Sequence, residues 1–301
     1  MAASFRLASA SLAGSAPFVV VVQGDRALPL AQAGTGLRAG SIEELLEDWE
    51  KSLAGLAAIA AKGLGDKAVA LADLRLHAPL TRPPGLFFAA VNYPRPNRER
   101  KDAPDMVKRP YLFEKSVRCI TGPYDDILKP DGFDKIDYEV ELALVIGQGG
   151  NRIPKERAMA HVAGFLIAND VTCRGFRKPG ELPIPGPDWF GSKCHDSFAP
   201  LGPFFVPRDF VPDCRNLRLT LKVNGELRQD GNSRDMVFSP EEQIAHVSNQ
   251  LTLRPGDIFS TGTPEGFGAQ SDSFLELGDI VEAEIEGLGT QRNRLVARPP
   301  A

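Results

Sequence analysis

Residues 137–146 read as a strand that begins with three carboxylates and then becomes apolar. Side chains alternate between the two faces of a strand, so Asp137, Glu139 and Glu141 are expected to share one face. Neighbouring carboxylates repel one another, and the run that follows is too apolar for an exposed sheet edge. A divalent cation between Glu139 and Glu141 would remove the conflict, because Mg²⁺, Mn²⁺ and Ca²⁺ accept oxygen ligands at about 2.0–2.6 Å. Alternatively, the acids pair with Lys or Arg on the polar face of an antiparallel strand.

The composition is that of a soluble globular protein and excludes several classes of partner. The chain of 301 residues has a net charge of −4 and no block of basic residues, so neither nucleic acid nor an anionic membrane is an expected partner. No apolar run approaches the roughly 20 residues of a membrane helix. Four cysteines without CxxC spacing indicate reduced thiols in a cytosolic protein. The Ser/Ala-rich start superficially resembles a transit peptide but is interpreted as a first strand, so a cytoplasmic location is expected.

Residues 1–80 are predicted to form a small accessory α/β region. Strand-like segments at residues 5–8, 18–22 and 27–30 are separated by turns. Ser41 then opens a capping box, and Leu45, Trp49, Leu53 and Leu56 recur at helical spacing, which predicts one helix.

Residues 81–301 are predicted to form a β-rich α+β domain. Short strands broken by Pro and Gly dominate, among them residues 87–91, 110–115 and 162–168. Asn224-Gly225 predicts a type I′ hairpin turn. Ser239-Pro240 predicts a helix start, with Ile244, Val247 and Leu251 on one face.

Asp170 is a third carboxylate of interest because it follows an apolar strand. An unpaired buried charge is costly, and ligands often lie where strands end in loops. The alternative is that Asp170 forms an Asx-turn or a helix cap with Thr172, and the local sequence pattern alone favours the turn.

An ordered set of motifs changes this weighting, because it resembles the fumarylacetoacetate hydrolase family. The motifs are residues 137–143 (Asp-Tyr-Glu-Val-Glu-Leu-Ala), 169–174 (Asn-Asp-Val-Thr-Cys-Arg), 192–193 (Ser-Lys), 197–203 (Ser-Phe-Ala-Pro-Leu-Gly-Pro), 254–258 (Arg-Pro-Gly-Asp-Ile) and 261–268 (Thr-Gly-Thr-Pro-Glu-Gly-Phe-Gly). The resemblance runs from about residue 86 to residue 296. It implies a mixed β-sandwich roll, a homodimer and a divalent metal, usually Mg²⁺ and sometimes Mn²⁺ or Ca²⁺.

The resemblance also implies roles for particular residues. The metal ligands would be Glu139, Glu141 and Asp170, and their excess negative charge calls for a cationic neighbour. Lys193 matches the family's active-site lysine, although a surface lysine in a Gly-rich loop is the plainer interpretation. The expected substrate-binding residues are Arg174, Thr263, Tyr93 and Arg177.

One departure from the family pattern concerns the catalytic base. Family hydrolases commonly carry a His-Glu pair after the Asn-Tyr dipeptide; here Glu99 falls near the expected glutamate, but Pro96 occupies the approximate place of the histidine. His195 and Glu276 are alternative candidates for the base. Arg177 could bind a substrate carboxylate with the arginines of residues 95–100, or that group could form a solvated lid.

The leading hypothesis is a metal-dependent enzyme that hydrolyses a C–C bond of a 2-oxo or 1,3-diketo acid. The missing histidine keeps a second hypothesis open, in which the same site decarboxylates or isomerises a 2-oxo dicarboxylic acid by stabilising an enolate. A third hypothesis is a non-catalytic relative that binds a metal and a ligand.

Overall fold

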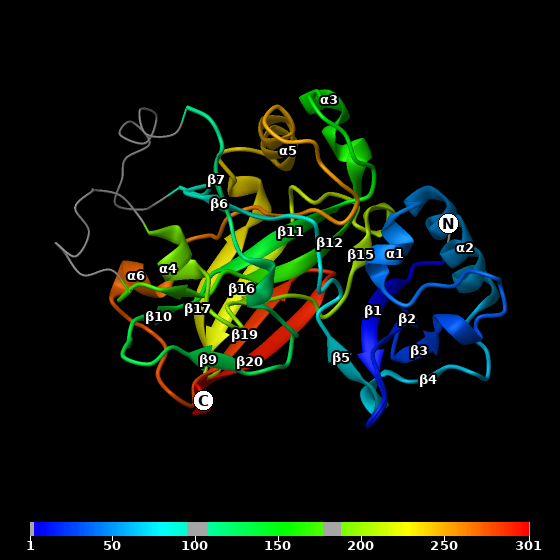
Figure 1. Ribbon diagram of the computed structural model, residues 1–301, viewed down its shortest axis with the longest axis horizontal. Helices are drawn as coiled ribbons and strands as arrows, with labels where there is room; N and C mark the ends of the chain where they lie inside the picture. The colour runs from blue at the N-terminus through cyan, green and yellow to red at the C-terminus, as the bar shows by residue number, and fades with distance from the viewer. Residues whose placement is uncertain (1–2, 95–107, 177–187, 301) are drawn as a thin grey trace.

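The computed structural model describes residues 3–94, 108–176 and 188–300. The N-terminal part, blue in Figure 1, contains a five-stranded sheet in the order β4-β3-β2-β1-β5. Its strands are β1 (Arg6–Ser11), β2 (Phe18–Gln23), β3 (Arg26–Pro29), β4 (Val69–Ala70) and β5 (Arg75–His77). Each paired strand runs antiparallel to its neighbour, as the turns between the apolar segments require.

The helix that the sequence predicts after Ser41 is divided into two. The Ser41 hydroxyl accepts a hydrogen bond from the Glu44 amide and starts α1 (Ile42–Leu46). The chain then begins again at α2 (Trp49–Lys62), because the Asp48 side chain accepts a hydrogen bond from the Lys51 amide and acts as a second N-cap. The apolar residues keep their helical spacing across the break between α1 and α2, so periodicity alone does not indicate the break.

A six-stranded sheet forms the centre of the molecule, in the order β15-β12-β11-β18-β6-β7. Its strands are β6 (Leu86–Ala90), β7 (Tyr111–Glu114), β11 (Val140–Ile146), β12 (Val162–Asn169), β15 (Val206–Pro207) and β18 (Ile258–Ser260). The neighbouring interior strands β11 and β12 are buried along their whole length. The predicted strand 137–146 is interrupted: Glu141 lies on the interior strand β11, whereas Glu139 precedes it and Asp137 ends the separate short strand β10 (Ile136–Asp137).

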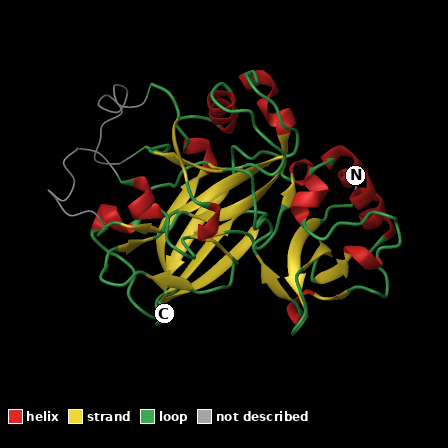
Figure 2. Ribbon diagram, viewed as in Figure 1, coloured by secondary structure: helices red, strands yellow, loops and turns green. Residues whose placement is uncertain are grey.

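A five-stranded sheet, β17-β16-β19-β20-β9, lies beside the first, and β16 and β19 contact β11 and β12 (Figure 2). Its strands are β9 (Ile127–Lys129), β16 (Arg218–Val223), β17 (Glu226–Asn232), β19 (Ile280–Ile285) and β20 (Gly289–Ala297). Burial alternates along β16 and β19, so one face of this sheet packs on the core. The predicted hairpin turn joins β16 to β17, with φ of 52° at Asn224 and 81° at Gly225.

Short elements complete the domain around these sheets. They are the strand pairs β10 (Ile136–Asp137) with β13 (Thr172–Cys173) and β8 (Ile120–Thr121) with β14 (Ala199–Pro200), and the helices α3 (Lys155–Ala158), α4 (Trp189–Lys193), α5 (Pro240–Ser248) and α6 (Gly268–Ser271). The helix predicted at Ser239 is α5, with a complete capping box formed with Glu242. Leu251 lies beyond its end and is exposed, contrary to its predicted place on the apolar face.

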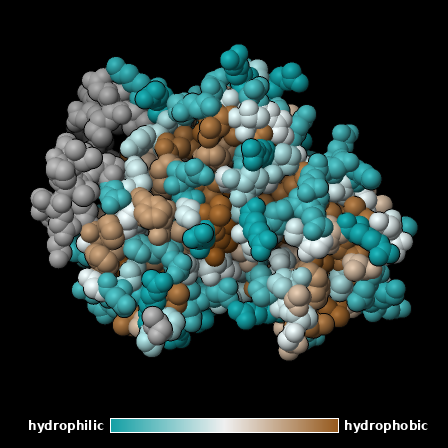
Figure 3. All heavy atoms as spheres, in the orientation of Figure 1, coloured by the Kyte–Doolittle hydropathy of each residue, from teal (hydrophilic) through white to brown (hydrophobic). Residues whose placement is uncertain are grey.

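The N-terminal part packs directly on the larger one. The amide of Leu7 donates to the Phe205 carbonyl at 2.8 Å, and the rings of Trp49 and Phe205 lie 5.3 Å apart. The predicted β-rich α+β class is confirmed, while the boundary at residue 80 and the homodimer stay predictions. No helix among the described residues is long and apolar enough to span a membrane. Figure 3 shows hydrophilic residues over much of the viewed face, with hydrophobic residues gathered toward its centre.

Candidate metal centre and active site

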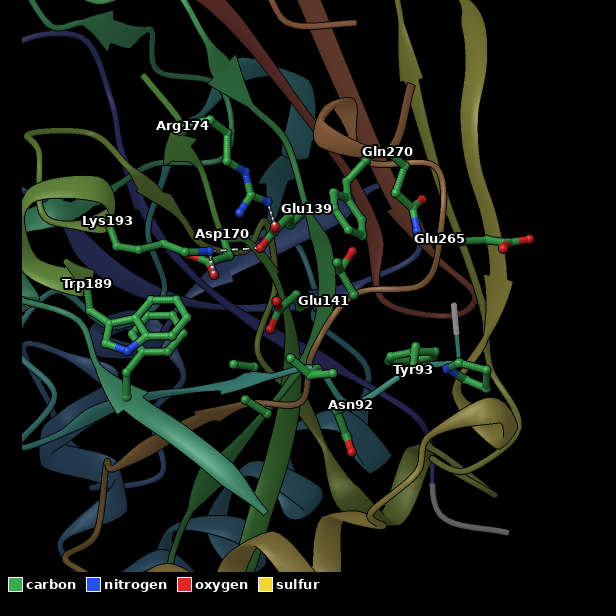
Figure 4. A pocket seen from close by; sticks show the side chains of 17 residues that line it. Asn92, Tyr93, Glu139, Glu141, Asp170, Arg174, Trp189, Lys193, Glu265 and Gln270 are labelled. Atoms are coloured by element: carbon green, nitrogen blue, oxygen red, sulfur yellow. Dashed lines mark hydrogen bonds and ion pairs between the residues drawn. The ribbon is translucent and has the colours of Figure 1, made fainter. Parts of the chain in front are cut away.

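Three carboxylates meet where β11 begins and β12 ends. Val140 pairs with Asn169 across the two strands, and the Asp170 amide donates to the Glu139 carbonyl at 2.9 Å. This register brings Asp170 next to Glu139 and Glu141, and carboxylate oxygens of all three lie within 4.8 Å of one another (Figure 4). Oxygen atoms this close fit a hard divalent cation such as Mg²⁺, Mn²⁺ or Ca²⁺.

Glu141 is held by donors from the neighbouring strand β18 and the loop after it. Its Oε2 atom accepts from the Ser260 hydroxyl at 2.6 Å and from the Gly262 amide at 2.9 Å. Gly262 has φ of +94°, and a Cβ there would lie 2.8 Å from the Asn92 Cβ. Glycine is therefore required at this position, where it keeps one oxygen of Glu141 fixed.

Three cations surround the carboxylates, two buried lysines and the half-buried Arg174. Lys193 Nζ donates to Glu139 Oε2 at 2.9 Å and also to Asp170 Oδ2 (Figure 4). Lys115 Nζ donates to Asp170 Oδ1 at 2.7 Å. The guanidinium of Arg174 pairs with Glu139. Thus the two interpretations of the acid pair are compatible, because the acids pair with cations and also lie close enough together for a metal.

Arg174 is held in place by a fourth buried carboxylate, Asp137. Arg174 Nε donates to Asp137 Oδ2 at 2.8 Å, while its other nitrogen reaches Glu139. Asp137 is fully buried and also accepts from the backbone amides at the start of α6. Its role in the structure is to position Arg174, and it is not one of the three grouped carboxylates.

Burial and neighbouring charges shift the pKa values in opposite directions across the cluster. Burial raises the pKa of Glu141, and the charges of Asp170 and Glu139 raise it further. Burial would also raise the pKa of Asp170, but Lys115 and Lys193 together lower it to about 2. Burial would lower the pKa of Lys193, yet the paired carboxylates Asp170 and Glu139 raise it, so this side chain is an ammonium at neutral pH.

The charge balance of the described cluster fits a bound dication. Four carboxylates, those of the three grouped acids and Asp137, face the three cations Lys115, Lys193 and Arg174. When all seven groups are ionised, the cluster has a net charge of −1. A bound divalent cation would change this net charge to +1. A site with that charge attracts an anionic substrate.

The pocket beside this cluster contains most of the predicted substrate-binding residues. Tyr93, Arg174, Lys193 and Thr263 all line it. The Tyr93 hydroxyl is buried and has no hydrogen-bond partner among the described residues, so it is available to a ligand. The Thr263 hydroxyl instead donates to the Val140 carbonyl at 2.8 Å and would have to leave it to donate to a substrate.

Two predicted catalytic bases lie elsewhere. His195 is absent from the pocket lining; its Nε2 atom bonds the Gly191 carbonyl at 2.7 Å, and its ring packs on Phe176 and Phe198. Glu276 is exposed and also outside the pocket lining. The geometry gives neither residue support as a base.

Two more candidates, Glu99 and Arg177, lie outside the described residues, as do the arginines of residues 95–100. Their assignments stay predictions.

Sequence reasoning missed Lys115 and the aromatic wall of the pocket. Lys115 is fully buried, and besides Asp170 its ammonium bonds the carbonyls of Phe198 and Val171. The rings of Phe113 and Trp189 stack in parallel with centroids 4.5 Å apart, and both line the pocket. The available signal for Lys115 was the need for positive charge near three carboxylates, which does not single out this lysine in the sequence.

We expect Lys115→Met to destabilise the metal-free protein by about 3–5 kcal/mol, because it removes one partner of a buried ion pair and two carbonyl contacts. Urea unfolding monitored by circular dichroism measures the change. Lys129→Met is the matched control, since Lys129 pairs with the exposed Asp134 and such pairs contribute about 0–1 kcal/mol. Equal effects of the two substitutions would show that the buried pair contributes nothing beyond a surface pair.

Comparisons with known proteins identify relatives of this chain. Residues 86–296 match the family model described as the fumarylacetoacetate hydrolase C-terminal region. The chain is 44% identical over 221 residues to a mitochondrial oxaloacetate tautomerase of Bos taurus, covering 73% of this chain and 68% of that protein. It is 37% identical over 237 residues to the oxaloacetate tautomerase YisK of Bacillus subtilis, covering 77% and 76%.

A solved structure extends the similarity to the whole fold. Maleylpyruvate hydrolase from Sphingobium, in complex with manganese(II) and pyruvate, superposes with a TM-score of 0.79 at 28% identity, covering 98% of this chain and 100% of that one. That relative holds a divalent metal, and the grouped carboxylates of this chain fit one as well.

Proposed function

The chain belongs to the fumarylacetoacetate hydrolase family, and we propose that it is a divalent-metal-dependent tautomerase, which interconverts the keto and enol forms of a 2-oxo dicarboxylic acid such as oxaloacetate. The sequence favoured hydrolytic C–C cleavage, which now becomes the second candidate. The observation that carries the proposal is the pocket itself, where a buried ammonium and a guanidinium face the carboxylates and, within the described residues, no histidine lines the wall. Hydrolysis requires a base that activates water, whereas tautomerisation requires only enolate stabilisation and a proton carrier. The names of the curated relatives support the same reaction.

The proposed metal ligands are Glu139, Glu141 and Asp170, with Mg²⁺ as the expected ion and Mn²⁺ or Ca²⁺ as alternatives. A divalent ion bound there would polarise the 2-oxo carbonyl and stabilise negative charge on its oxygen. Arg174 is half-buried at the pocket wall and fixed by Asp137, so we assign it to a substrate carboxylate.

Lys193 is the proposed proton carrier. In the enol-to-keto direction its ammonium gives a proton to C3, and the resulting amine accepts the proton of the enol oxygen. The reverse order of steps forms the enol. The stacked rings of Phe113 and Trp189 exclude water from this side of the pocket, which strengthens the electrostatic interactions inside it.

The test is to add enol-enriched oxaloacetate to the metal-loaded protein and follow the loss of the enol's ultraviolet absorbance. We expect a rate well above the uncatalysed conversion, abolished by EDTA and restored by Mg²⁺ or Mn²⁺, with no release of CO₂. Oxaloacetate loss accompanied by CO₂ would assign a decarboxylase instead. A catalysed rate that is indifferent to EDTA would contradict the metal dependence.

Hydrolysis remains the second candidate, because the maleylpyruvate hydrolase that binds manganese and pyruvate matches nearly the whole chain. Maleylpyruvate and acylpyruvates, assayed for pyruvate release, test this reaction. Pyruvate release faster than oxaloacetate tautomerisation would restore the hydrolase as the main function. Metal-dependent thermal stabilisation by oxalate, without turnover of any of these acids, would indicate a non-catalytic binding protein.

A further inference from the structure

Two cysteines lie on the segments that supply the active-site lysines. Cys119 is the last residue of the 3₁₀ turn (Val117–Cys119) that follows Lys115, and Cys194 directly follows Lys193. Because both ammonium groups bond the Asp170 carboxylate, the two segments are held together at that residue. The cysteines have no part in the tautomerase proposal.

The two thiols lie close to each other. The Ser116 amide donates to Cys194 Sγ at 3.4 Å, which places Cys194 against the 3₁₀ turn that ends at Cys119, and the two thiols are close enough for each to shift the pKa of the other. Cys119 is fully buried, whereas Cys194 is half-buried and can meet a small molecule from solvent. An accessible sulfur with a second sulfur behind it is the arrangement found in redox-sensitive cysteine pairs.

This proximity makes the two sulfurs chemically different. The interaction with the Cys119 thiol lowers the pKa of Cys194 to about 6, against the effect of burial and with help from the Ser116 amide and the charge of Lys115. The same interaction, together with burial, raises the pKa of Cys119. At neutral pH the pair therefore consists of a nucleophilic thiolate at Cys194 and a thiol at Cys119.

We propose that Cys119 and Cys194 form a redox-modification site, at which a hydroperoxide converts the two thiols into a disulfide and thereby slows the adjacent active site. The Cys194 sulfur attacks the hydroperoxide, an S–O bond forms as the O–O bond breaks, and the leaving oxygen takes up a proton as an alcohol or water. The sulfur of Cys119 then attacks the sulfenic acid, the S–S bond forms, the S–O bond breaks and water leaves. In total, one hydroperoxide is reduced as two thiols are oxidised.

The consequence for the site follows from bond lengths. A disulfide bond is about 2.05 Å long, which is shorter than any hydrogen bond between sulfur atoms, so oxidation must draw the two segments together. Lys193 is the residue before Cys194, and its ammonium is fixed between Glu139 and Asp170. Misplacing a catalytic group by about 1 Å can lower a rate by about 100-fold. We expect a loss of turnover that a reductant reverses.

The other cysteines differ in ways that make the reaction selective. Cys173 and Cys214 are buried, and burial raises the pKa of each thiol, to about 11 for Cys214. They should remain thiols under conditions that oxidise Cys194. We therefore expect the hydroperoxide to oxidise Cys119 and Cys194 and to leave Cys173 and Cys214 reduced.

The experiment treats the full chain with a small excess of hydrogen peroxide, blocks free thiols with iodoacetamide, and maps the tryptic peptides by mass. Trypsin cleaves after Arg118 and Lys193, so the two cysteines begin separate peptides, residues 119–135 and 194–208. We expect these peptides to be linked and to separate on reduction with dithiothreitol. The oxaloacetate tautomerase rate, measured on the same samples, should fall about tenfold or more and recover with dithiothreitol.

Three variants make the result decisive. Cys119→Ser should stop at the sulfenic acid, which dimedone labels at Cys194, while Cys194→Ser should form no disulfide and Cys214→Ser should behave as the parent protein. Absence of the linked peptides, or labelling of Cys214 as fast as Cys194, would overturn the inference. A disulfide that leaves turnover unchanged would overturn its effect on the site. Lack of tautomerase activity in the reduced protein would overturn the proposed function and not the disulfide, which is measured by mass.

Discussion

Glu141→Gln is expected to abolish metal-dependent stabilisation and to lower tautomerase turnover by about 1,000-fold or more. Glu141 contributes one of three grouped carboxylates, and its other oxygen is already held by Ser260 and Gly262. Glutamine has the same shape and keeps an oxygen for those donors, but it places an amide nitrogen where the metal requires an oxygen. The substitution therefore tests coordination with little change in packing.

Without metal, Glu141→Gln is not expected to lower the stability of the protein. Burial and the charges of Asp170 and Glu139 raise the pKa of Glu141, which means that its ionised form is unfavourable without a cation. Removing that charge should leave the melting temperature of the metal-free protein unchanged or higher. Lower stability would indicate that Glu141 is a structural residue whose charge stabilises the fold.

Differential scanning fluorimetry with and without Mg²⁺ measures both effects. At a metal concentration about 100-fold above the dissociation constant, binding stabilises by about 2.7 kcal/mol, which corresponds to a rise of about 5 °C in the parent protein. Glu282→Gln is the matched control, because Glu282 lies on β19 in an exposed pair with Arg292. A rise retained in Glu141→Gln would show that the metal binds elsewhere.

Much of this site could be predicted from the sequence because the information is local. Alternation along residues 137–146 predicted that Glu139 and Glu141 lie together, although the strand begins only at Val140, and the order of motifs predicted Asp170 and Lys193 beside them. The match to the family model confirms the family, and the structure confirms the fold class and places all four side chains in one cluster. Local patterns also predicted the hairpin at Asn224 and the cap at Ser239.

What could not be predicted depends on contacts between segments far apart in the chain. Lys115 directly follows β7, and its buried ammonium bonds the Asp170 carboxylate and the Phe198 carbonyl, which lie far from it in the chain. The side chain of His195 follows Lys193 by two positions, yet it bonds the Gly191 carbonyl and does not line the pocket. Sequence spacing does not determine such side-chain directions.

Lys193→Met is expected to lower tautomerase turnover by about 1,000-fold while leaving a metal-dependent rise in melting temperature. Proton transfer by a positioned group contributes about 100- to 10,000-fold to a rate, and methionine fills the same space without a proton to give. All three grouped carboxylates remain, so the metal can still bind. We expect tighter metal binding than in the parent protein, because the variant lacks the cation that pairs with Glu139 and Asp170.

This separation of turnover from metal affinity distinguishes a proton carrier from a structural lysine. Isothermal titration with Mn²⁺ gives the affinity, and the enol absorbance assay gives the rate. Lys155→Met is the matched control, because Lys155 pairs with Glu242 on the surface, where such pairs contribute little. If Lys193→Met kept turnover within about threefold of the parent, the proton would have to come from another group. The hydroxyl of Tyr93 in the same pocket, which has no hydrogen-bond partner among the described residues, would be the next to substitute.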